Sequence, residues 1–355
     1  MRILFIKHSL DRSELDMVMA LHQRGVYIRV LALPGSLGSD QMAAEGIFIA
    51  SKNYRSKISI PLISQIRGLI KYLKFDLLHC PESKGLGNAI FASYFTPVKI
   101  VAYRGTLARI HRTDPGIWLG LLHPKVNKII CVNQSIYDYL GKFFPDQKLM
   151  LNYKGYDVSW NQYDGIDEQP MPACAQDPDA FVVMYIAEAK NRPHKGLGTL
   201  VDAMHQLKSE QVHLIFIGSH DESVEKQALA GKAGARIHFM GMLPYAAQYL
   251  KYANTFVLPS TRDGFPRVIK EAMAEGLPVI STDIPGPNEL VIDGETGLLV
   301  EAGSATAIAT AIDTLAADPK NCRALGERGR QFLQDKFSTT AFTDKTHALY
   351  KALVG

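Results

Sequence analysis

Two carboxylates lie near each other in the sequence, in a stretch with the pattern of a strand, a loop and a helix. Asp263 and Glu271 are separated by seven residues. Eight helical positions span about 12 Å, at roughly 1.5 Å per residue, so the two carboxylates cannot share one proton or one metal ion. They could instead hold two ends of one extended ligand. A structural interpretation also stays open, in which Asp263 caps a helix and Glu271 lies on its solvated flank.

The residues around this pair have the pattern of a βαβ unit. Residues 256–258 form a short apolar run of strand type, and turn residues follow them. Pro266 suits the first turn of a helix that stops near Gly276, and residues 277–282 are predicted to form the next buried strand. Open α/β sheets bind ligands beyond the carboxyl ends of their strands, and a helix N-terminus at that place favours phosphate. We therefore expect the two carboxylates at the mouth of an anion-binding loop.

The same stretch carries a long motif, DGFPRVIKEAMAEGLPVI, which begins at Asp263 and is continued by ELVIDGETGLLV. The motif resembles that of the retaining nucleotide-sugar glycosyltransferases of family 4, whose usual form has an acidic residue, Gly-Phe and then Glu-Ala-Met-Ala-x-Gly-x-Pro-Val-Ile. The first acid of the family is usually Glu, and here it is Asp263. A second departure lies after the first predicted strand, where the loop reads KHSLDRSEL in place of the family's pair of glycines.

The resemblance implies an α/β fold of two doubly wound, Rossmann-like domains that face a cleft, the GT-B architecture. Residues 1–165 would form the acceptor-side domain, residues 166–337 the nucleotide-sugar donor domain, and residues 338–355 a helix that crosses back to the N-terminal domain. The resemblance also implies a retaining hexosyltransferase that needs no metal and uses a nucleoside diphosphate-sugar, with a UDP-sugar favoured, as its co-substrate. The acceptor would be a glycan or glycolipid hydroxyl in bacterial-type cell-surface polysaccharide or lipopolysaccharide synthesis.

A second motif, Arg192-Pro-His-Lys195-Gly196, precedes a predicted helix and resembles the family's diphosphate clamp. Negative charge grows on the leaving phosphate as the glycosidic bond breaks, so fixed cations stabilise the transition state more than the ground state. The resemblance assigns Arg192 and Lys195 to the diphosphate, Glu271 to the ribose hydroxyls and Asp263 to the sugar hydroxyls. The rest of the donor pocket is expected to include Gly264, Phe265, Arg267, Met242 and Lys190.

The expected acceptor side is less sharply defined by the sequence. The segment FDLLHCPESKG resembles the family segment that ends a strand at the cleft, so Glu82 is expected to face it. At the end of the next predicted strand the family often has a His, and Arg104 occupies that place with His111 nearby. Residues 51–60 are basic and lack a helical period, which indicates a loop with a short strand. This loop is either a part of the acceptor side or a mobile surface loop.

Composition and charge limit the class of protein. A chain of 355 residues with 47% hydrophobic and 21% charged residues is typical of a globular protein with two domains. Residues 1–165 contain 21 Lys and Arg against 12 Asp and Glu, whereas the rest contains 18 against 23. A basic N-terminal half suggests an anionic acceptor or peripheral contact with an anionic membrane surface, although a solvated charged face explains it too. We expect no nucleic-acid partner.

The N-terminus lacks the long apolar core of a signal peptide, so we expect a cytoplasmic protein, with peripheral contact to the inner face of the membrane as an extension of that view. The four cysteines are far apart and show neither metal-ligand nor disulfide spacing, which indicates incidental thiols. They are Cys80, Cys131, Cys174 and Cys322.

Other functions remain open at this point. A sugar-nucleotide epimerase or hydrolase on the same architecture would keep the donor clamp without an acceptor site. A non-catalytic sugar-nucleotide-binding subunit would fit the altered first loop and the shortened acid. A dinucleotide-dependent dehydrogenase is disfavoured because no Gly-x-Gly-x-x-Gly follows the first predicted strand.

Overall fold

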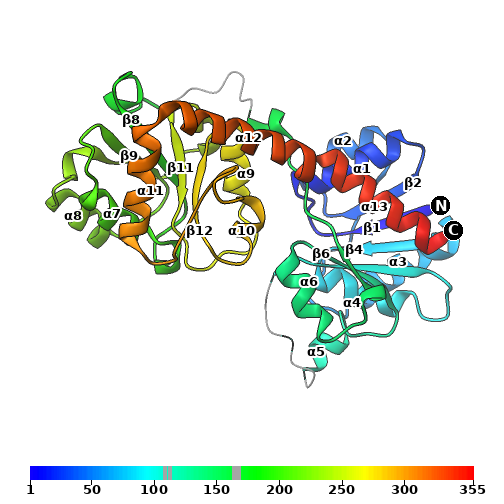
Figure 1. The fold of residues 1–355 in the computed structure, drawn as a ribbon. Helices are drawn as coiled ribbons and strands as arrows, with labels where there is room; N and C mark the ends of the chain where they lie inside the picture. Colours follow the sequence, from blue (N-terminus) through cyan, green and yellow to red (C-terminus); the bar gives the residue numbers. More distant parts are fainter. Residues whose placement is uncertain (107–109, 111–113, 162–168) are drawn as a thin grey trace. The chain divides into compact units, whose positions relative to one another are not determined.

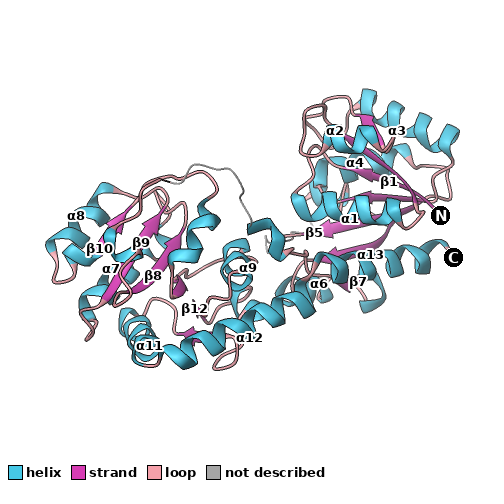
Figure 2. Ribbon diagram, turned by 90° about the horizontal axis from the view of Figure 1, so that it is seen from above, coloured by secondary structure: helices cyan, strands magenta, loops and turns pink. Residues whose placement is uncertain are grey.

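The computed structural model describes residues 1–106, 110, 114–161 and 169–355. The chain divides into two compact units (Figures 1 and 2). The first contains Met1–Gly155 and Phe337–Gly355, and the second contains Tyr156–Lys336. The division falls between Gly155 and Tyr156, whereas the sequence led us to expect it after residue 165. Both units have the expected class of fold, a parallel β-sheet with helices on its two faces.

The first unit is built on a seven-stranded parallel sheet with the strand order β3-β2-β1-β4-β5-β6-β7. Its strands are β1 (Arg2–Ile6), β2 (Tyr27–Ala32), β3 (Phe48–Ala50), β4 (Leu77–Cys80), β5 (Lys99–Arg104), β6 (Val126–Cys131) and β7 (Leu149–Leu151). Its helices are α1 (Arg12–Gln23), α2 (Ser39–Ala44), α3 (Ile60–Leu73), α4 (Ser83–Ala92), α5 (Pro115–Trp118), α6 (Gln134–Gly141) and α13 (Thr339–Val354).

The second unit has a six-stranded parallel sheet with the order β10-β9-β8-β11-β12-β13. Its strands are β8 (Phe181–Ile186), β9 (Val212–Ile217), β10 (Ile237–Phe239), β11 (Thr255–Leu258), β12 (Val279–Thr282) and β13 (Gly297–Val300). Its helices are α7 (Leu197–Gln206), α8 (Glu222–Ala230), α9 (Arg267–Ala274), α10 (Pro287–Leu290), α11 (Ala305–Ala317) and α12 (Pro319–Phe337), the last of which ends in the first unit.

Each sheet has one place where the order of its strands reverses. In the first unit the reversal lies between β1 and β4, and in the second between β8 and β11. The helices that follow two such strands lie on opposite faces of the sheet, so their loops part and leave a crevice at the carboxyl ends of the strands. The central strands are apolar and buried on both faces, as parallel sheets require. Each unit therefore has one reversal point, at the carboxyl ends of buried strands, where open α/β sheets bind ligands.

The last helix, α13, is packed into the first unit along α1, which Figure 1 shows beside it. Phe342, Leu349 and Tyr350 of this helix belong to the same buried core as the residues of β1. The Tyr350 hydroxyl forms a hydrogen bond with Nδ1 of His79 on β4, and both side chains are buried. Burial lowers the pKa of His79 to about 3, so its ring stays neutral and can accept this hydrogen bond.

One expectation about local structure was wrong, and one strand was not predicted. The loop of residues 51–59 contains no strand, because β3 ends at Ala50. Tyr54 in that loop is buried, with an exposed fraction of 2%, and anchors the loop to the first unit. Residues 149–151 form strand β7, which no pattern in the sequence indicated.

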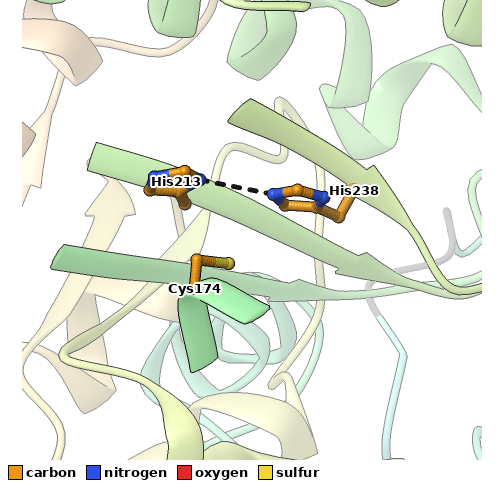
Figure 3. Close-up of side chains that lie close together, drawn as sticks. All are labelled: Cys174, His213 and His238. Carbon is orange, nitrogen blue, oxygen red and sulfur yellow. Dashed lines mark hydrogen bonds between the residues drawn. The ribbon is translucent and has the colours of Figure 1, made fainter. Parts of the chain in front are cut away.

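All four cysteines are buried free thiols. Cys174, however, lies beside His213 and His238, which no spacing in the sequence indicated (Figure 3). Among the helices that the structure describes, none combines the length and the apolar character needed to cross a membrane.

The contact between α13 and β4 gives a prediction about stability. Tyr350→Phe keeps the ring but removes the hydroxyl, which leaves Nδ1 of a buried histidine without its hydrogen-bond donor. We expect a loss of about 1–3 kcal/mol in the free energy of unfolding of the first unit, measured by denaturant titration. Tyr72→Phe is the matched control because Tyr72 is 80% exposed, and it should change stability by less than about 0.5 kcal/mol. Equal stabilities of the two variants would contradict this role of the hydroxyl.

Candidate functional site

The first candidate site is built on the two strands at the reversal point of the second unit. β8 and β11 are adjacent and parallel, with Thr255 paired to Val183 and Phe256 to Met184. The loop after β8 runs through residues 187–196 and enters α7, and the loop after β11 runs through residues 259–266 and enters α9. The two predicted motifs occupy these loops, although they lie about seventy residues apart in the sequence. The sheet therefore brings both motifs to one crevice.

Backbone contacts hold the two loops against each other. The Thr261 N–H donates to the His194 carbonyl at 2.8 Å. Gly196 has a φ of +75°, and a Cβ added to it would lie 2.1 Å from the Pro259 carbonyl oxygen. Only glycine fits this position, because a side chain would both be strained and overlap the backbone of the other loop. The Tyr185 hydroxyl donates to the Lys195 carbonyl at 2.6 Å and fixes the loop from below.

An ion pair joins the two motifs. Lys195 Nζ lies 2.8 Å from Asp263 Oδ2, with both side chains largely buried. The other oxygen, Oδ1 of Asp263, accepts a hydrogen bond from the Gly264 N–H at 2.9 Å. Asp263 is not the N-cap of the following helix, because Pro266 occupies that position. The structure thus excludes the simple capping role and places this carboxylate beside the lysine that the sequence pairs with a diphosphate.

Glu271 is buried on α9, with an exposed fraction of 9%. Its carboxylate accepts a hydrogen bond from Arg267 Nε at 2.9 Å, and its backbone carbonyl accepts one from Asn161 Nδ2 at 2.9 Å. Burial raises the pKa of Glu271 above its ordinary value, and the positive charges of Arg267 and Lys270 partly offset this shift. Glu271 is therefore not a solvated flank residue, and its carboxylate has the dry surroundings in which hydrogen bonds from ligand hydroxyls are strong.

The other residues expected around the donor lie in the loops that surround this pair. Arg192 is exposed and pairs with Glu188 at 3.2 Å, not with Asp263. Lys190 is also exposed, and its N–H donates to the Ser219 carbonyl at 3.0 Å. Met242, which follows β10, is 63% exposed.

The ring of Phe265 contacts a buried lysine that the sequence did not single out. Lys270 has an exposed fraction of 5%, and its Nζ lies 5.3 Å from the centre of the Phe265 ring. The same nitrogen lies 5.9 Å from the centre of the Tyr156 ring. These aromatic faces attract the cation and hold it beside Glu271. In the sequence Lys270 lies within an amphipathic helical pattern, so no local signal marked it as a buried residue of the site.

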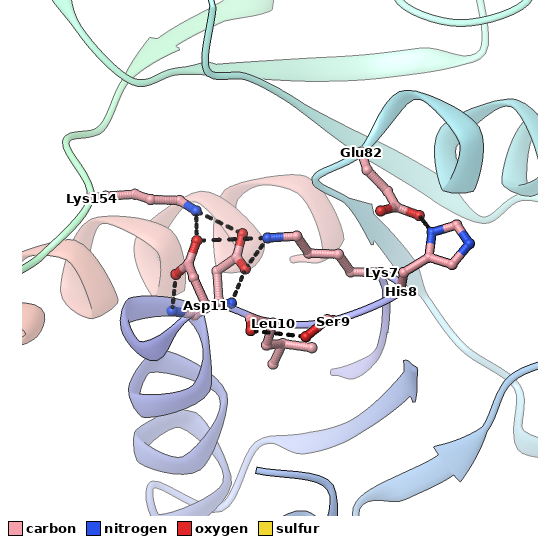
Figure 4. Close-up of polar contacts among 8 residues, drawn as sticks. Lys7, His8, Ser9, Leu10, Asp11, Glu82 and Lys154 are labelled. Atoms are coloured by element: carbon pink, nitrogen blue, oxygen red, sulfur yellow. Dashed lines mark hydrogen bonds and ion pairs between the residues drawn. The ribbon is translucent and has the colours of Figure 1, made fainter. Parts of the chain in front are cut away.

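The second candidate site lies at the reversal point of the first unit (Figure 4). His8 follows β1 and Glu82 follows β4, and Nδ1 of His8 lies 2.5 Å from Oε1 of Glu82. His8 Nε2 lies 2.8 Å from the Tyr54 carbonyl, and the Tyr54 hydroxyl donates to Glu82. Both ring nitrogens of His8 thus lie within hydrogen-bond distance of oxygen atoms, which fixes the orientation of the ring. Glu82 thus lies at the reversal point of this sheet beside His8 and Tyr54, two residues that the sequence did not reveal, and its role on the acceptor side stays a prediction.

Next to this cluster, side chains of the protein bind the free N–H groups at the N-terminus of α1, where an anionic ligand could otherwise bind. Asp11 and Glu14 form a capping box, in which each carboxylate accepts a hydrogen bond from the other residue's N–H. Lys7 and Lys154 pair with both of these carboxylates, and Figure 4 shows the two lysines converging on Asp11. Burial lowers the pKa of Lys154, but the negative charges around it raise it above the ordinary value overall. Two cations and two carboxylates fill the place where the family has its pair of glycines.

Arg104 and His111, the remaining predicted residues, have different outcomes. Arg104 ends β5, which is separated from β1 by β4. Its Nε donates to the Thr106 carbonyl at 2.9 Å, and burial lowers the pKa of its guanidinium. His111 lies outside the described residues, so its role stays a prediction.

Sequence reasoning missed His8, Tyr54 and Lys154 because their partners lie far along the chain. Tyr54 and Glu82 are 28 residues apart, and Lys154 and Asp11 are 143 apart. For His8, the only available signal was its place directly after the first strand. The pairing of strands, rather than any local spacing, brings these groups together.

Comparisons with known proteins match both halves of the chain. The family model described as "Glycosyltransferase Family 4" matches residues 12–160, and the model "Glycosyl transferases group 1" matches residues 174–332. The chain is 34% identical over 166 residues to the lipopolysaccharide core biosynthesis glycosyltransferase LpsE of Rhizobium meliloti, which is 47% of this chain and 48% of LpsE. The chain thus spans about half the length of this relative. LpsD of the same organism, also a lipopolysaccharide core biosynthesis glycosyltransferase, is 26% identical over 348 residues, 94% of this chain and 92% of LpsD.

Solved structures share the fold. HepE of Anabaena, solved in complex with UDP, superposes with a TM-score of 0.80 at 19% identity and covers 99% of this chain and 100% of its own. A glycosyltransferase from Rickettsia africae gives a TM-score of 0.81 at 18% identity, with 99% and 98% covered. Two α/β units, each with a crevice at its reversal point, define the GT-B class. Within that class, the chain belongs to glycosyltransferase family 4.

The contact between the two loops of the second unit can be tested by its glycine. Gly196→Ala adds a methyl group that strains the backbone and overlaps the Pro259 carbonyl, so we expect the second unit to lose about 2 kcal/mol or more of stability. The matched control is Gly198→Ala in the adjoining helix, where an added Cβ meets nothing within 4 Å and the backbone is helical. There we expect no loss, since alanine favours helices over glycine by about 1 kcal/mol. Calorimetric unfolding measures both; a similar stability of the two variants would show that the loops do not need this contact.

Proposed function

We propose that this protein transfers a sugar from a nucleoside diphosphate-sugar to a hydroxyl of a glycan or glycolipid. The observation that carries the proposal is the Lys195–Asp263 pair at the crevice of the second unit. A cation suited to phosphate and a carboxylate suited to hydroxyls lie in contact there, as the phosphate and sugar ends of one donor require. Membership of family 4 supports the proposal, and so do relatives named for lipopolysaccharide core biosynthesis.

In the proposed complex, the donor spans the three charged positions in order. The ribose hydroxyls donate to Glu271, the diphosphate lies against Lys195 and Arg192, and the sugar hydroxyls donate to Asp263. To do so, the diphosphate takes over part of the Asp263 contact with Lys195, and Arg192 turns from Glu188 to the phosphate. Gly264, Phe265 and Arg267 would line the sugar end, and Met242 the base end, with Lys190 as a further cation for the phosphates.

The chemical step follows from these positions. The acceptor oxygen forms a bond to the anomeric carbon while the bond from that carbon to the diphosphate oxygen breaks. Lys195 and Arg192 stabilise the charge that grows on the leaving oxygen, which is the task of a divalent metal in other enzymes of this kind. The acceptor proton passes to the departing phosphate, on the face that it leaves, so the transfer retains the anomeric configuration. No metal takes part in this scheme.

We assign the acceptor to the first unit, where His8, Tyr54 and Glu82 offer charged and hydroxyl groups at the crevice. The excess of Lys and Arg in residues 1–165 supports an anionic glycan or glycolipid, and with it a peripheral contact at the inner membrane face. A UDP-sugar is the favoured donor, since HepE was solved with UDP. The proposed setting is the synthesis of a cell-surface polysaccharide or lipopolysaccharide.

The test is a donor assay. The protein is incubated with UDP-, GDP- and ADP-sugars and a pool of membrane glycolipids, and the released diphosphate and glycosylated lipid are both measured. We expect one class of donor to give diphosphate and product in equal amounts. Diphosphate release without product would instead indicate a hydrolase, and nucleotide binding without release a non-catalytic subunit. Either result would overturn the proposal.

The same assay tests the role of Lys195. Lys195→Ala should lower the transfer rate by about 100-fold or more, because it removes the fixed charge beside the leaving group. Lys195→Arg keeps a positive charge and should restore part of the rate. The matched control is Lys226→Ala on α8, where the side chain is 81% exposed, and its rate should match that of the unchanged protein. A wild-type rate for a folded Lys195→Ala variant would remove Lys195 from the reaction.

A further inference from the structure

Three side chains of metal-binding type meet at the edge of the second unit's sheet. Cys174 lies on the short 3-10 turn Ala173–Ala175 before β8, His213 on β9 and His238 on the edge strand β10. One sulfur and two ring nitrogens, each from a different segment, all lie within 4.8 Å of one another. Figure 3 shows Cys174 beside the two imidazole rings.

The cluster is distinct from the donor loops of the same unit. Cys174 precedes the start of β8, and His213 is the second residue of β9, so the cluster lies near the amino ends of strands. The motifs of Lys195 and Asp263 follow the carboxyl ends of β8 and β11. In a parallel sheet all strands have their carboxyl ends on the same side. The cluster and the donor loops therefore lie toward opposite ends of the strands.

The spacing of the two histidines fits a shared metal ion. His213 Nδ1 lies 3.3 Å from His238 Nε2. Two nitrogens bound to one tetrahedral zinc at 2.0–2.1 Å are separated by about 3.3 Å. The rings are nearly parallel, with an angle of 13° between their planes. A hydrogen bond between two neutral rings has a similar length, so the histidines alone do not separate the two explanations.

The presence of Cys174 favours the zinc ion over a simple hydrogen bond between the two histidines. A hydrogen bond between two imidazoles needs no thiol, whereas a thiolate beside two imidazoles is a preferred ligand set for zinc. Cys174 is buried, with an exposed fraction of 7%, and its sulfur lies within 4.8 Å of a ring nitrogen of each histidine.

Two charged side chains act electrostatically on the cluster. Asp177 acts on both Cys174 and His213, and its negative charge favours a cation there. Arg236 acts on His213 in the opposite sense, with the larger effect of the two. A thiolate at Cys174 would itself offset one of the two positive charges of a zinc ion.

We propose that Cys174, His213 and His238 bind a zinc ion that stabilises this end of the sheet. The Cys174 thiol releases its proton to solvent and binds as thiolate, while each histidine binds through the nitrogen that faces the other ring. A water completes the tetrahedron. The ion ties the segment before β8 to β9 and to the edge strand β10, and it reinforces β10, which has three residues and pairs in the sheet with β9.

Metal content and stability test the site directly. The full chain is stripped with a chelator, dialysed, supplied with Zn²⁺ and freed of excess, and its metal is counted by mass spectrometry. We expect about one zinc per chain and a melting temperature that rises on adding zinc, because binding to the folded state alone stabilises it. With Co²⁺ in place of zinc, a thiolate-to-cobalt absorption band should appear in the near ultraviolet.

Variants identify the ligands. Cys174→Ser and His238→Gln should each lose the bound zinc, the cobalt band and the gain in melting temperature. The matched control is Cys322→Ser, a second buried thiol of the same unit, whose Sγ contacts the Asn254 carbonyl; it should keep all three. If a variant does not fold, the unchanged protein still decides the matter. No zinc in the unchanged protein, no cobalt–thiolate band, or equal zinc in the unchanged protein and a folded Cys174→Ser variant would each overturn the proposal.

The donor assay distinguishes this inference from the proposed function. A protein that transfers sugar but binds no zinc would refute the zinc site alone. A protein that binds zinc through Cys174 but releases no diphosphate would refute only the transferase.

Discussion

The candidate donor site depends on the close approach of two loops at the reversal point of the second sheet. The approach is possible because Gly196 has no side chain where the Pro259 carbonyl lies. It places Lys195 against Asp263, so one cation and one carboxylate from distant motifs form a single charged surface. Helix α9, which begins after this loop, then carries Glu271 into a buried position beside Arg267. The fold thus sets the positions of these charged groups, and the Lys195–Asp263 pair sets the charge of the candidate site.

The two units apply the same topology with different residues. Each has a polar cluster at its reversal point, and in both clusters charged side chains pair with one another. The capping box of Asp11 and Glu14 neutralises the start of α1, and Lys7 and Lys154 complete the charge balance. An anionic ligand would have to displace these contacts to reach the helix terminus. The neighbouring group of His8, Tyr54 and Glu82 is joined by hydrogen bonds in the same way.

The sequence predicted the fold class and the motifs of the candidate donor site. It did not predict the contacts between side chains that are distant in the chain, for physical reasons. The strand predicted at residues 256–258 was found as β11, because buried parallel strands are continuous apolar runs between turn residues. The GT-B fold and the family followed from the long motif that begins at Asp263. By contrast, β7 was missed, since Leu149–Leu151 is too short to show a period. The contacts of Tyr54 with Glu82, and of Cys174 with His213, depend on how distant segments pack, which no local pattern encodes.

The most direct measurement is a crystal structure of the protein with the nucleoside diphosphate of its preferred donor. We expect diphosphate oxygens within hydrogen-bond distance of Lys195 Nζ, and ribose hydroxyls that donate to the Glu271 carboxylate. We also expect Asp263 to keep an oxygen directed at the place of the sugar. A nucleotide bound elsewhere, with the Lys195–Asp263 and Arg267–Glu271 pairs undisturbed, would refute the proposed donor site.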